Sequence, residues 1–424
     1  MDLRHKSIKA LGRPKRLDSY REDFMKTRDK PCFLISVSIE QSGRLEEFEC
    51  LRLIYCSFSI MIKIKRTKFS LTLLYGKEGM NMDIEQKLNL IKRNTEEILT
   101  EEELAELLKN KAEPVVYLGN APTGRPHIGY LIPAMKIRDF VNAGLKVKIL
   151  LADIHAHLDN MKSPLELLAK RVEFYKLELT ALYKSIGVNI LKIEFVKGSD
   201  FQLSKEYSLD MYRLASQVSA DRAKHAAAEV VKFGDAPKLG GFLYPLLQTI
   251  DEEYLGADIQ YGGVDQRKIF GFARESHPKI GQSKRVEIMT PMLPGIDGGK
   301  MSASESGSKI DLLDREEVIA AKIKKAYCPE GDLADNGIME FMKYVVMMLK
   351  EDAGEKLLVE RPEKFGGNVE YKNYADLEKD FVDKKLHPED LKKALVGELV
   401  KILAPVREAL AGKEELMKEA YPEK

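Results

Sequence analysis

A single lysine stands in a very flexible stretch of the sequence, PGIDGGKMSASESG, at residues 294–307. Glycines let a loop change shape at little steric cost, and backbone amides together with serine hydroxyls bind phosphate oxygens. Lys300, Met301, Ser302 and Ser304 could therefore close on an anionic group. A solvated surface turn is the alternative that this stretch alone leaves open.

A second candidate anion site is the turn YLGNAPTGRPHIGY, at residues 117–130. It precedes a predicted helix, whose N-terminal amides favour an anion. We predict that His127 donates a hydrogen bond to a phosphate oxygen, and that Gly119 and Gly129 leave room for close approach and for a flat ring. A histidine that only caps the helix is the alternative.

A third candidate segment is YPLLQTIDEEYLGADIQYGGVDQRK, at residues 244–268. Tyr244, Gln248 and Asp251 fall at i, i+4 and i+7, so they share one helix face, and Pro245 suits the first turn of that helix. This face is either solvated or turned into a pocket. The apolar residues between these positions favour the pocket.

The elements that must position these residues alternate between strand and helix periods from residue 111 onward. Strands are predicted at 114–119, 147–153, 191–197, 257–261 and 285–289, and helices at 131–144, 164–186 and 206–231. This order predicts an α/β fold, a Rossmann-like, doubly wound, mostly parallel sheet with a helical insertion. In such folds ligands bind at the carboxyl ends of the strands.

The remaining segments suggest three domains. Residues 82–313 form the predicted Rossmann domain, which opens with apolar residues at helical spacing over 82–110, where Thr100 and Glu103 suggest a capping box. Residues 314–424 are helical throughout and predict a separate all-α domain. Residues 1–81 are basic and irregular; we interpret them as a dispensable extension, disordered or targeting in character.

Composition bounds the function. The 424 residues contain no apolar run of 18 or more, so no membrane span is predicted. Residues 1–81 carry a net charge of +7 and the rest −6, so nucleic acid would have to bind through local patches. The four cysteines lack metal-ligand spacing, which favours a reducing compartment, the cytoplasm. We predict no metal site; His155 and His157 are interpreted as pocket-lining or packing residues.

The turn with His127 and the lysine loop, in this order at the ends of a Rossmann sheet, resemble the two signatures of the class I aminoacyl-tRNA synthetases. From Tyr117 to the chain end the sequence is similar to the tyrosyl-tRNA synthetases of the eukaryotic and archaeal type. ADIHAHLDNMK, the Tyr-Pro-x-x-Gln-x-x-Asp spacing, GGVDQRK and KMSAS carry the resemblance. Tyr130 and Ala303 depart from the family pattern.

The resemblance implies roles for the candidate residues. Tyr117 and Asp251 would bind the phenol hydroxyl of tyrosine, whose proton an aspartate can accept. Its ammonium group would be bound by Tyr244, Gln248 and Gln266, whose side-chain oxygens can accept its protons. The residues implied in binding ATP are Gly119, His127, Gly129, Asp265, Lys300 and Met301, with Asp265 near the ribose, and the residues implied in catalysis are His127, Gly129, Lys300, Ser302 and Ser304.

In the helical domain, RPEKFGGN and HPEDLK resemble the anticodon reader of the family. Phe365 could stack on an unpaired base, and Asp390, next to His387, could accept from guanine. An acid that merely favours the first turn of a helix is the alternative for Asp390.

The expected activity is ligation of tyrosine to tRNA(Tyr). ATP with Mg²⁺ would be a substrate, no cofactor would be tightly bound, and a homodimer would form through the insertion, with helix 164–186 as a candidate. Two alternatives stay open. One is a tryptophanyl-tRNA synthetase, whose indole substrate has no hydroxyl for Asp251, and the other is a catalytically silent RNA-binding paralogue.

Overall fold

The computed structural model describes residues 36–41, 44–49, 82–159, 161–296, 298 and 309–422. The chain divides into two compact units, Met1–Tyr75 and Gly76–Lys424. In the first unit, β1 (Ser36–Gln41) pairs with β2 (Arg44–Glu49) in an antiparallel hairpin, which the sequence did not predict. Among the helices in these ranges, none is long and apolar enough to cross a membrane.

A six-stranded sheet organises the second unit, in the order β3-β8-β7-β4-β5-β6. All neighbouring strands are parallel except β3, which runs antiparallel to β8. The strands are β3 (Glu97–Leu99), β4 (Val115–Asn120), β5 (Lys146–Leu151), β6 (Ile193–Lys197), β7 (Ile259–Gly263) and β8 (Val286–Thr290). The predicted Rossmann-like, doubly wound fold is thereby confirmed.

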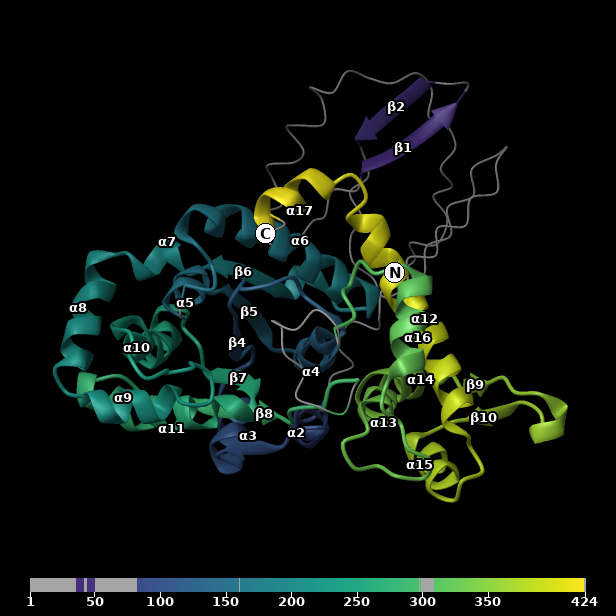
Figure 1. Cartoon of the computed structure of the whole chain (residues 1–424). Helices are drawn as coiled ribbons and strands as arrows, with labels where there is room; N and C mark the ends of the chain where they lie inside the picture. Colours follow the sequence, from purple (N-terminus) through teal and green to yellow (C-terminus); the bar gives the residue numbers. More distant parts are fainter. Residues whose placement is uncertain are drawn as a thin grey trace, which may run out of the picture. The chain divides into compact units, whose positions relative to one another are not determined.

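Helices cover both faces of this sheet. They are α2 (Ile84–Lys92), α3 (Glu101–Asn110), α4 (Leu131–Asn142), α5 (Asp153–Leu158), α6 (Leu168–Ser185), α7 (Ser199–Gln202), α8 (Lys205–Ala215), α9 (Ala220–Ala227), α10 (Leu239–Tyr254) and α11 (Arg267–Ser276). In Figure 1, α8, α9 and α10 lie to the left of the strands, whereas α12 to α16 of the C-terminal region lie to the right.

Two local predictions were wrong, and one element was not predicted. The stretch 82–110 forms α2 and α3, and the unpredicted edge strand β3 lies between them and pairs with β8. Thr100 precedes α3 without a side-chain capping bond, and the capping box forms between Asp83 and Gln86 instead. The stretch 206–231 is broken between α8 and α9, because Ser219 starts a new helix by accepting the amide of Arg222.

Strand β4 shows how the sheet separates core from pocket. Val116 and Leu118 belong to the main hydrophobic core, while Tyr117 lies between them in a small separate cluster with Leu150 and Ala257. Since side chains alternate across a strand, these two sets occupy opposite faces. The face of Tyr117 is the one that carries the candidate site.

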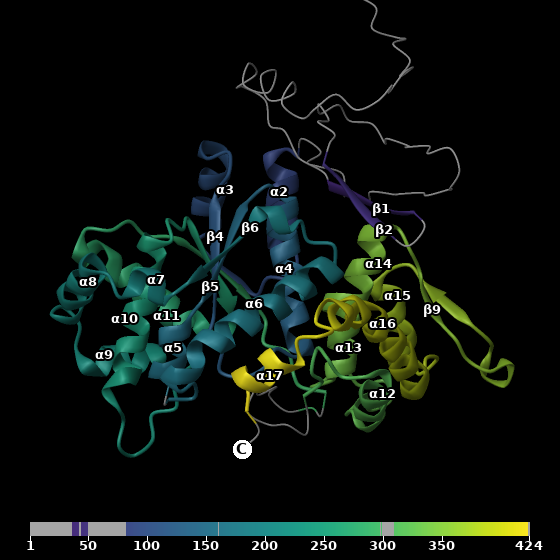
Figure 2. The same ribbon diagram turned by 90° about the horizontal axis from the view of Figure 1, so that it is seen from above.

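The C-terminal region is helical, as predicted. Its elements are α12 (Glu316–Lys325), α13 (Gly337–Phe341), the π-helical turn η6 (Met342–Met347), α14 (Met348–Ala353), α15 (Tyr374–Val382), α16 (Pro388–Ala409) and α17 (Glu414–Ala420), seen from above in Figure 2. A short hairpin of β9 (Leu357–Val359) and β10 (Val369–Tyr371) was not predicted. The main core contains residues of this region and of the sheet alike, so the boundary at residue 313 stays a prediction.

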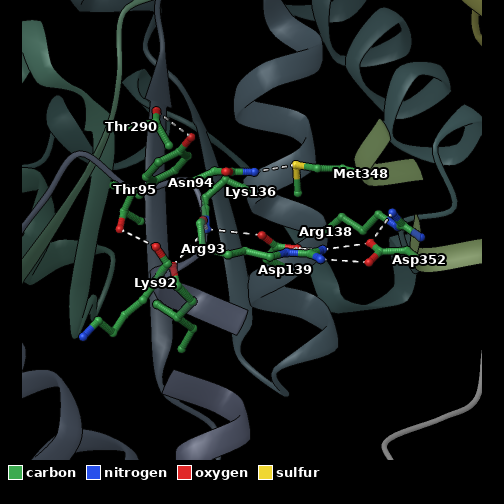
Figure 3. A network of polar contacts seen from close by, with 12 residues as sticks. Lys92, Arg93, Asn94, Thr95, Lys136, Arg138, Asp139, Thr290, Met348 and Asp352 are labelled. Atoms are coloured by element: carbon green, nitrogen blue, oxygen red, sulfur yellow. Dashed lines mark hydrogen bonds and ion pairs between the residues drawn. The ribbon is translucent and has the colours of Figure 1, made fainter. Parts of the chain in front are cut away.

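An ion network links α4 to the C-terminal region (Figure 3). Arg93, which follows α2, pairs with the fully buried Asp139 of α4 and with Asp352 of α14, the latter through two bonds of 2.8 Å. Arg138 also reaches Asp352, at 3.0 Å. Lys136 lies 3.2 Å from Asp139. Removing one partner from such a buried set costs several kcal/mol, so the network fixes the far end of α4.

Candidate functional site

The candidate residues gather where the strand order of the sheet reverses. From β4, the chain continues to β5 and β6 in one direction and to β7 and β8 in the other. The turn with His127 follows β4, and the 3-10 turn η4 (Val264–Gln266) follows β7. Both predicted segments thus follow adjacent parallel strands at a switch point, where ligands bind in such folds.

Tyr117 and Asp251 form the buried polar end of the site. The side chain of Tyr117 is 1% exposed and that of Asp251 is 0% exposed. Burial raises the pKa of the Tyr117 hydroxyl, and the nearby charges of Asp251 and Glu252 raise it further. The hydroxyl of Tyr117 accepts a bond of 3.1 Å from the amide of Gln260. The charge of Asp251 therefore acts on the Tyr117 hydroxyl, while the role predicted for both residues in binding a phenol hydroxyl stays a prediction.

Two side chains that the sequence did not single out hold the carboxylate of Asp251. The amide of Gln202 in α7 donates to both its oxygens, at 2.8 and 3.0 Å, and the hydroxyl of Tyr207 in α8 donates at 2.7 Å. Burial raises the pKa of Asp251 to about 7, although these two donors act in the opposite direction. Asp251 is thus a buried acceptor whose charge depends on pH near neutrality.

Helix α10 positions the other predicted pocket residues. Gln248 donates through its amide to the Oε1 of Gln266 at 3.2 Å, so the two amides predicted for the ammonium group meet. Burial raises the pKa of Tyr244, and the charges of three carboxylates nearby add to this, namely Asp159, Asp265 and Asp251. An electronegative environment of this kind suits a cationic group.

Pro245 does not lie where the sequence placed it. Helix α10 begins at Leu239, so Pro245 occupies its interior instead of its first turn. Proline there removes a backbone donor and crowds the carbonyl four residues earlier, which is Gly241. The hydroxyl of Thr249 also donates to the Pro245 carbonyl, at 2.8 Å.

His155 packs against two candidate residues, which is one of the two roles predicted for it. Its ring packs edge-on against Tyr244 with centroids 4.7 Å apart, and its Nε2 lies 3.7 Å from Asp251. Burial lowers the pKa of His155 to about 3, so the ring is neutral. His157 instead contacts the carbonyl of Ser163 at 3.1 Å. In the described parts of the chain, no group of three or more potential ligands could hold a metal ion.

His127 caps the short turn η1 (Ile128–Tyr130) that leads into α4. Capping is the role that the sequence left open as the alternative to phosphate binding. Its Nδ1 accepts the backbone amide of Gly129 at 3.2 Å. Burial lowers the pKa of His127 to about 4, so at pH 7 the neutral ring carries its proton on Nε2. Capping thus leaves Nε2 able to donate to an anion.

Tyr130 packs its ring edge-on against His127, with centroids 5.2 Å apart, and its hydroxyl accepts from Tyr175 of α6 at 2.6 Å. Tyr130 therefore supports the histidine ring. Packing within the protein does not require glycine at position 119, because a Cβ there would meet Tyr117 only at ordinary contact distances of 3.6 and 3.7 Å.

The segment after the lysine loop is joined to the turn that holds His127. The Ile128 amide donates to the Ile310 carbonyl at 2.9 Å, and Arg125 pairs with Asp311 at 2.6 Å. The ammonium of Lys309 donates to the Arg125 carbonyl at 3.1 Å. The predicted residues Lys300, Met301, Ser302 and Ser304, and also Ala303, lie outside the described residues.

Asp265 lines a cavity of about 550 Å³ beside the loop's other flank. The residues around it are Glu229, Val264, Asp265, Arg267, Lys268, Met292, Leu293, Pro294, Gly298 and Asp335. Its size is in the range of small-molecule sites. The cations of its wall are paired, Arg267 with Glu97 at 2.6 Å and Lys268 with Glu229 at 2.8 Å.

In the helical region, Phe365 is 60% exposed, ends the turn η7 (Glu363–Phe365), and has the Lys364 ammonium 4.8 Å from its ring centroid. Arg361 donates to the carbonyls of Gly367 and Lys385, so it ties the first predicted segment to the turn just before the second. His387 caps α16 by accepting the Glu389 amide, and Asp390, in the first turn of α16, is 8% exposed. Phe365 is free to stack, whereas Asp390 is largely buried.

Comparison with known proteins places the chain in a family. The model of the class I tRNA synthetases for tryptophan and tyrosine (W and Y) matches residues 109–404. The chain belongs to this family of class I tRNA synthetases.

Within the family, the chain is similar to proteins named for tyrosine. It is 49% identical to a cytoplasmic tyrosine–tRNA ligase of Gallus gallus over 80% of this chain and 64% of that one. It is 44% identical to a tyrosine–tRNA ligase of Haloarcula marismortui, over 81% of this chain and 99% of that one. The crystal structure of a tyrosyl-tRNA synthetase from Archaeoglobus fulgidus, complexed with L-tyrosine, superposes with a TM-score of 0.72 at 40% identity, over 78% of this chain and all of that one. The chain thus spans about two thirds of the length of the animal relative.

Proposed function

We propose that this protein activates tyrosine with ATP and transfers it to tRNA(Tyr). The observation that carries the proposal is the buried pair of Tyr117 and Asp251 on the pocket face of the sheet. A carboxylate at 0% exposure is costly unless it binds something, and a phenol hydroxyl could satisfy it together with its present donors. The similar proteins named for tyrosine support the same substrate.

The pocket residues suggest how tyrosine is oriented. Its hydroxyl would lie between Tyr117 and Asp251, and its ammonium group near Tyr244, Gln248 and Gln266, where carboxylates make the environment electronegative. This orientation points the substrate carboxylate toward the turn with His127 and the carboxyl end of β7. ATP, with Mg²⁺ on its phosphates, would occupy that end, with Asp265 at the ribose.

The reaction needs no covalent nucleophile from the protein. The tyrosine carboxylate attacks the α-phosphorus of ATP, the bond to the pyrophosphate oxygen breaks, and tyrosyl-adenylate forms. Neutral His127 donates from Nε2 to a phosphate oxygen, and Lys300 meets the charge that develops on pyrophosphate. The terminal ribose hydroxyl of the tRNA, 2′ by resemblance to class I, then displaces AMP and takes the tyrosyl group.

Pyrophosphate exchange, measured with each of the twenty amino acids, tests this proposal. We expect exchange with tyrosine at least a hundredfold above phenylalanine and tryptophan, because only tyrosine satisfies Asp251. Exchange that depends on tryptophan would replace the proposal with a tryptophanyl-tRNA synthetase. A folded protein without any exchange would indicate the silent paralogue.

Recognition of the tRNA would use the helical region. The exposed ring of Phe365, with Lys364 beside it, offers a stacking surface and a cation to an unpaired base. Because Asp390 is largely buried, it could accept from a base only at its exposed edge. A cytoplasmic location is part of the proposal and is supported by the names of the relatives.

A homodimer is also part of the proposal, but through a different helix. Helix α6, the expected candidate, packs against α16 and α17. Apolar side chains are exposed instead on and before α8, where Leu203, Leu209 and Tyr212 are 70%, 48% and 73% exposed. We expect sedimentation to give a dimer, and the double change Leu209→Asp with Tyr212→Asp to give a monomer. A dimer that persists in this variant would direct the interface elsewhere.

A further inference from the structure

One buried polar residue of the sheet has no role so far. Gln260 is 1% exposed and lies in the buried strand β7, between the apolar residues Ile259 and Tyr261. A glutamine in such a position must find hydrogen-bond partners, because an unsatisfied buried amide is costly. Its amide nitrogen donates to the Tyr117 hydroxyl at 3.1 Å, so its partner is a candidate substrate-binding residue.

The sheet register keeps this contact in place. Gln260 is the register partner of Tyr117 on β4 and of Glu287 on β8, so the three side chains share one face of adjacent strands. Gln260 Oε1 and Glu287 Oε1 have no hydrogen-bond partner among the described residues. Burial raises the pKa of Glu287 to about 9 and so favours its protonated form, although Arg274, which donates to Glu287 Oε2 at 3.1 Å, acts in the opposite direction. A protonated carboxyl can donate to an amide oxygen, which would keep the amide nitrogen toward Tyr117.

We propose that Gln260 is a positioning residue that sets the direction of the hydrogen bonds in the substrate pocket. A phenol hydroxyl has one proton. Because the Tyr117 oxygen already accepts from Gln260, its own proton is directed into the pocket and toward the oxygen of the substrate hydroxyl. Asp251 accepts the proton of that hydroxyl. The pocket then selects a group that accepts from one side and donates to the other.

This inference rests on the proposed function and deepens it. It assigns substrate selection to the order of donors and acceptors as well as to the presence of Asp251. Tyrosine fits this order, phenylalanine offers neither group, and 4-aminophenylalanine offers two donors but only a weak acceptor. If the Tyr117 hydroxyl accepts from the pocket instead of donating to it, the preferred substrate among these three should therefore change.

Two variants separate direction from packing. Gln260→Leu removes the donor but keeps an apolar side chain of similar size, so the hydroxyl proton of Tyr117 no longer has a fixed direction. We expect the ratio of kcat/KM for tyrosine over phenylalanine to fall about tenfold, with little change for phenylalanine itself. Gln260→Glu replaces the amide donor by a carboxyl, whose carbonyl oxygen can accept from Tyr117 while a proton held by burial faces Glu287, so Tyr117 donates to residue 260 and presents an oxygen to the pocket. We expect 4-aminophenylalanine then to gain on tyrosine at least about tenfold relative to the parent protein.

The matched control is Thr290→Val. Thr290 lies 3.1 Å from the hydroxyl of Tyr261, so this change also removes the partner of a buried tyrosine, but on the core face of β7. It should leave the tyrosine-to-phenylalanine ratio unchanged while lowering thermal stability by an amount similar to Gln260→Leu. This comparison distinguishes an effect on selection from a general loss of packing.

The outcomes are separable from those of the proposed function. If the unaltered protein shows no tyrosine-dependent exchange, the proposed function fails. If it does show exchange, but folded Gln260→Leu keeps the parent tyrosine-to-phenylalanine ratio, Gln260 has no positioning role. Should Gln260→Glu not fold, the Gln260→Leu ratio alone decides.

Discussion

Replacing Asp251 by asparagine should stabilise the fold while it damages tyrosine activation. The change keeps Oδ1, which accepts from Gln202 at 2.8 Å and from Tyr207 at 2.7 Å, and it removes the buried charge together with the weaker bond of 3.0 Å that Oδ2 accepts from Gln202. Burial has raised the pKa of Asp251 from 3.8 to about 7. This difference in pKa corresponds to a free-energy cost of about 4 kcal/mol for the charged carboxylate in the folded protein relative to the unfolded chain.

The sign of the pH dependence follows from the direction of this pKa. A folded-state pKa above the unfolded value means that the folded protein holds the proton more tightly. The stability that Asp251 contributes is complete below pH 3.8 and is lost as the pH rises to about 7. The advantage of Asp251→Asn should therefore be less than about 2 kcal/mol at pH 5 and up to about 4 kcal/mol at pH 8.

Urea unfolding at pH 5 and pH 8 measures this difference, and pyrophosphate exchange measures the cost to tyrosine. The matched control is Asp139→Asn, because Asp139 is equally buried but paired with Arg93 and Lys136. That variant should lose stability, since it leaves cations without their counter-charge. An equal gain for Asp251→Asn at both pH values, or a tyrosine-to-phenylalanine ratio that does not change, would refute the reasoning.

Four further changes have defined outcomes. Lys300→Ala should lower the rate of adenylate formation about a hundredfold with little effect on tyrosine affinity, as single-turnover kinetics would measure. Gly262→Ala places a Cβ 2.9 Å from the Phe270 ring and 3.0 Å from the Gln266 side chain, and it should raise the KM for tyrosine in exchange assays without a comparable loss of kcat. Phe365→Ala should raise the KM for tRNA in charging assays but leave exchange unchanged. Removing residues 1–81 should leave tyrosine-dependent exchange intact, and its loss in a folded shortened protein would contradict this.

Much of the sheet could be predicted because its strands are short apolar runs with turns between them. The strand predicted at 114–119 is β4 at Val115–Asn120, and that at 285–289 is β8 at Val286–Thr290. Helix ends were less predictable. The break after α8 depends on the capping hydroxyl of Ser219, and a serine inside an amphipathic pattern does not by itself reveal whether it caps.

The site was predictable where family-like spacing or one helix face defined it, as for Tyr244, Gln248 and Asp251. Gln202 and Tyr207 were missed because they reach Asp251 from helices more than 40 residues earlier in the chain, and only the packing of α7 and α8 on α10 brings them there. Gln260 did leave a signal. It is a polar residue in an otherwise apolar buried strand.

Helix α4 connects the turn with His127 to the ion network at its other end. Its first turn follows His127, and its far end is held by Arg93 and Asp352 through Asp139 and Arg138 (Figure 3). At 1.5 Å per residue its 12 residues make a rod of about 18 Å, so a tilt of about 3° at the held end displaces the histidine by about 1 Å. A misplacement of this size can cost about a hundredfold in rate. Small rotations of the C-terminal region, far from any reacting atom, are therefore mechanically amplified at the turn where ATP is proposed to bind.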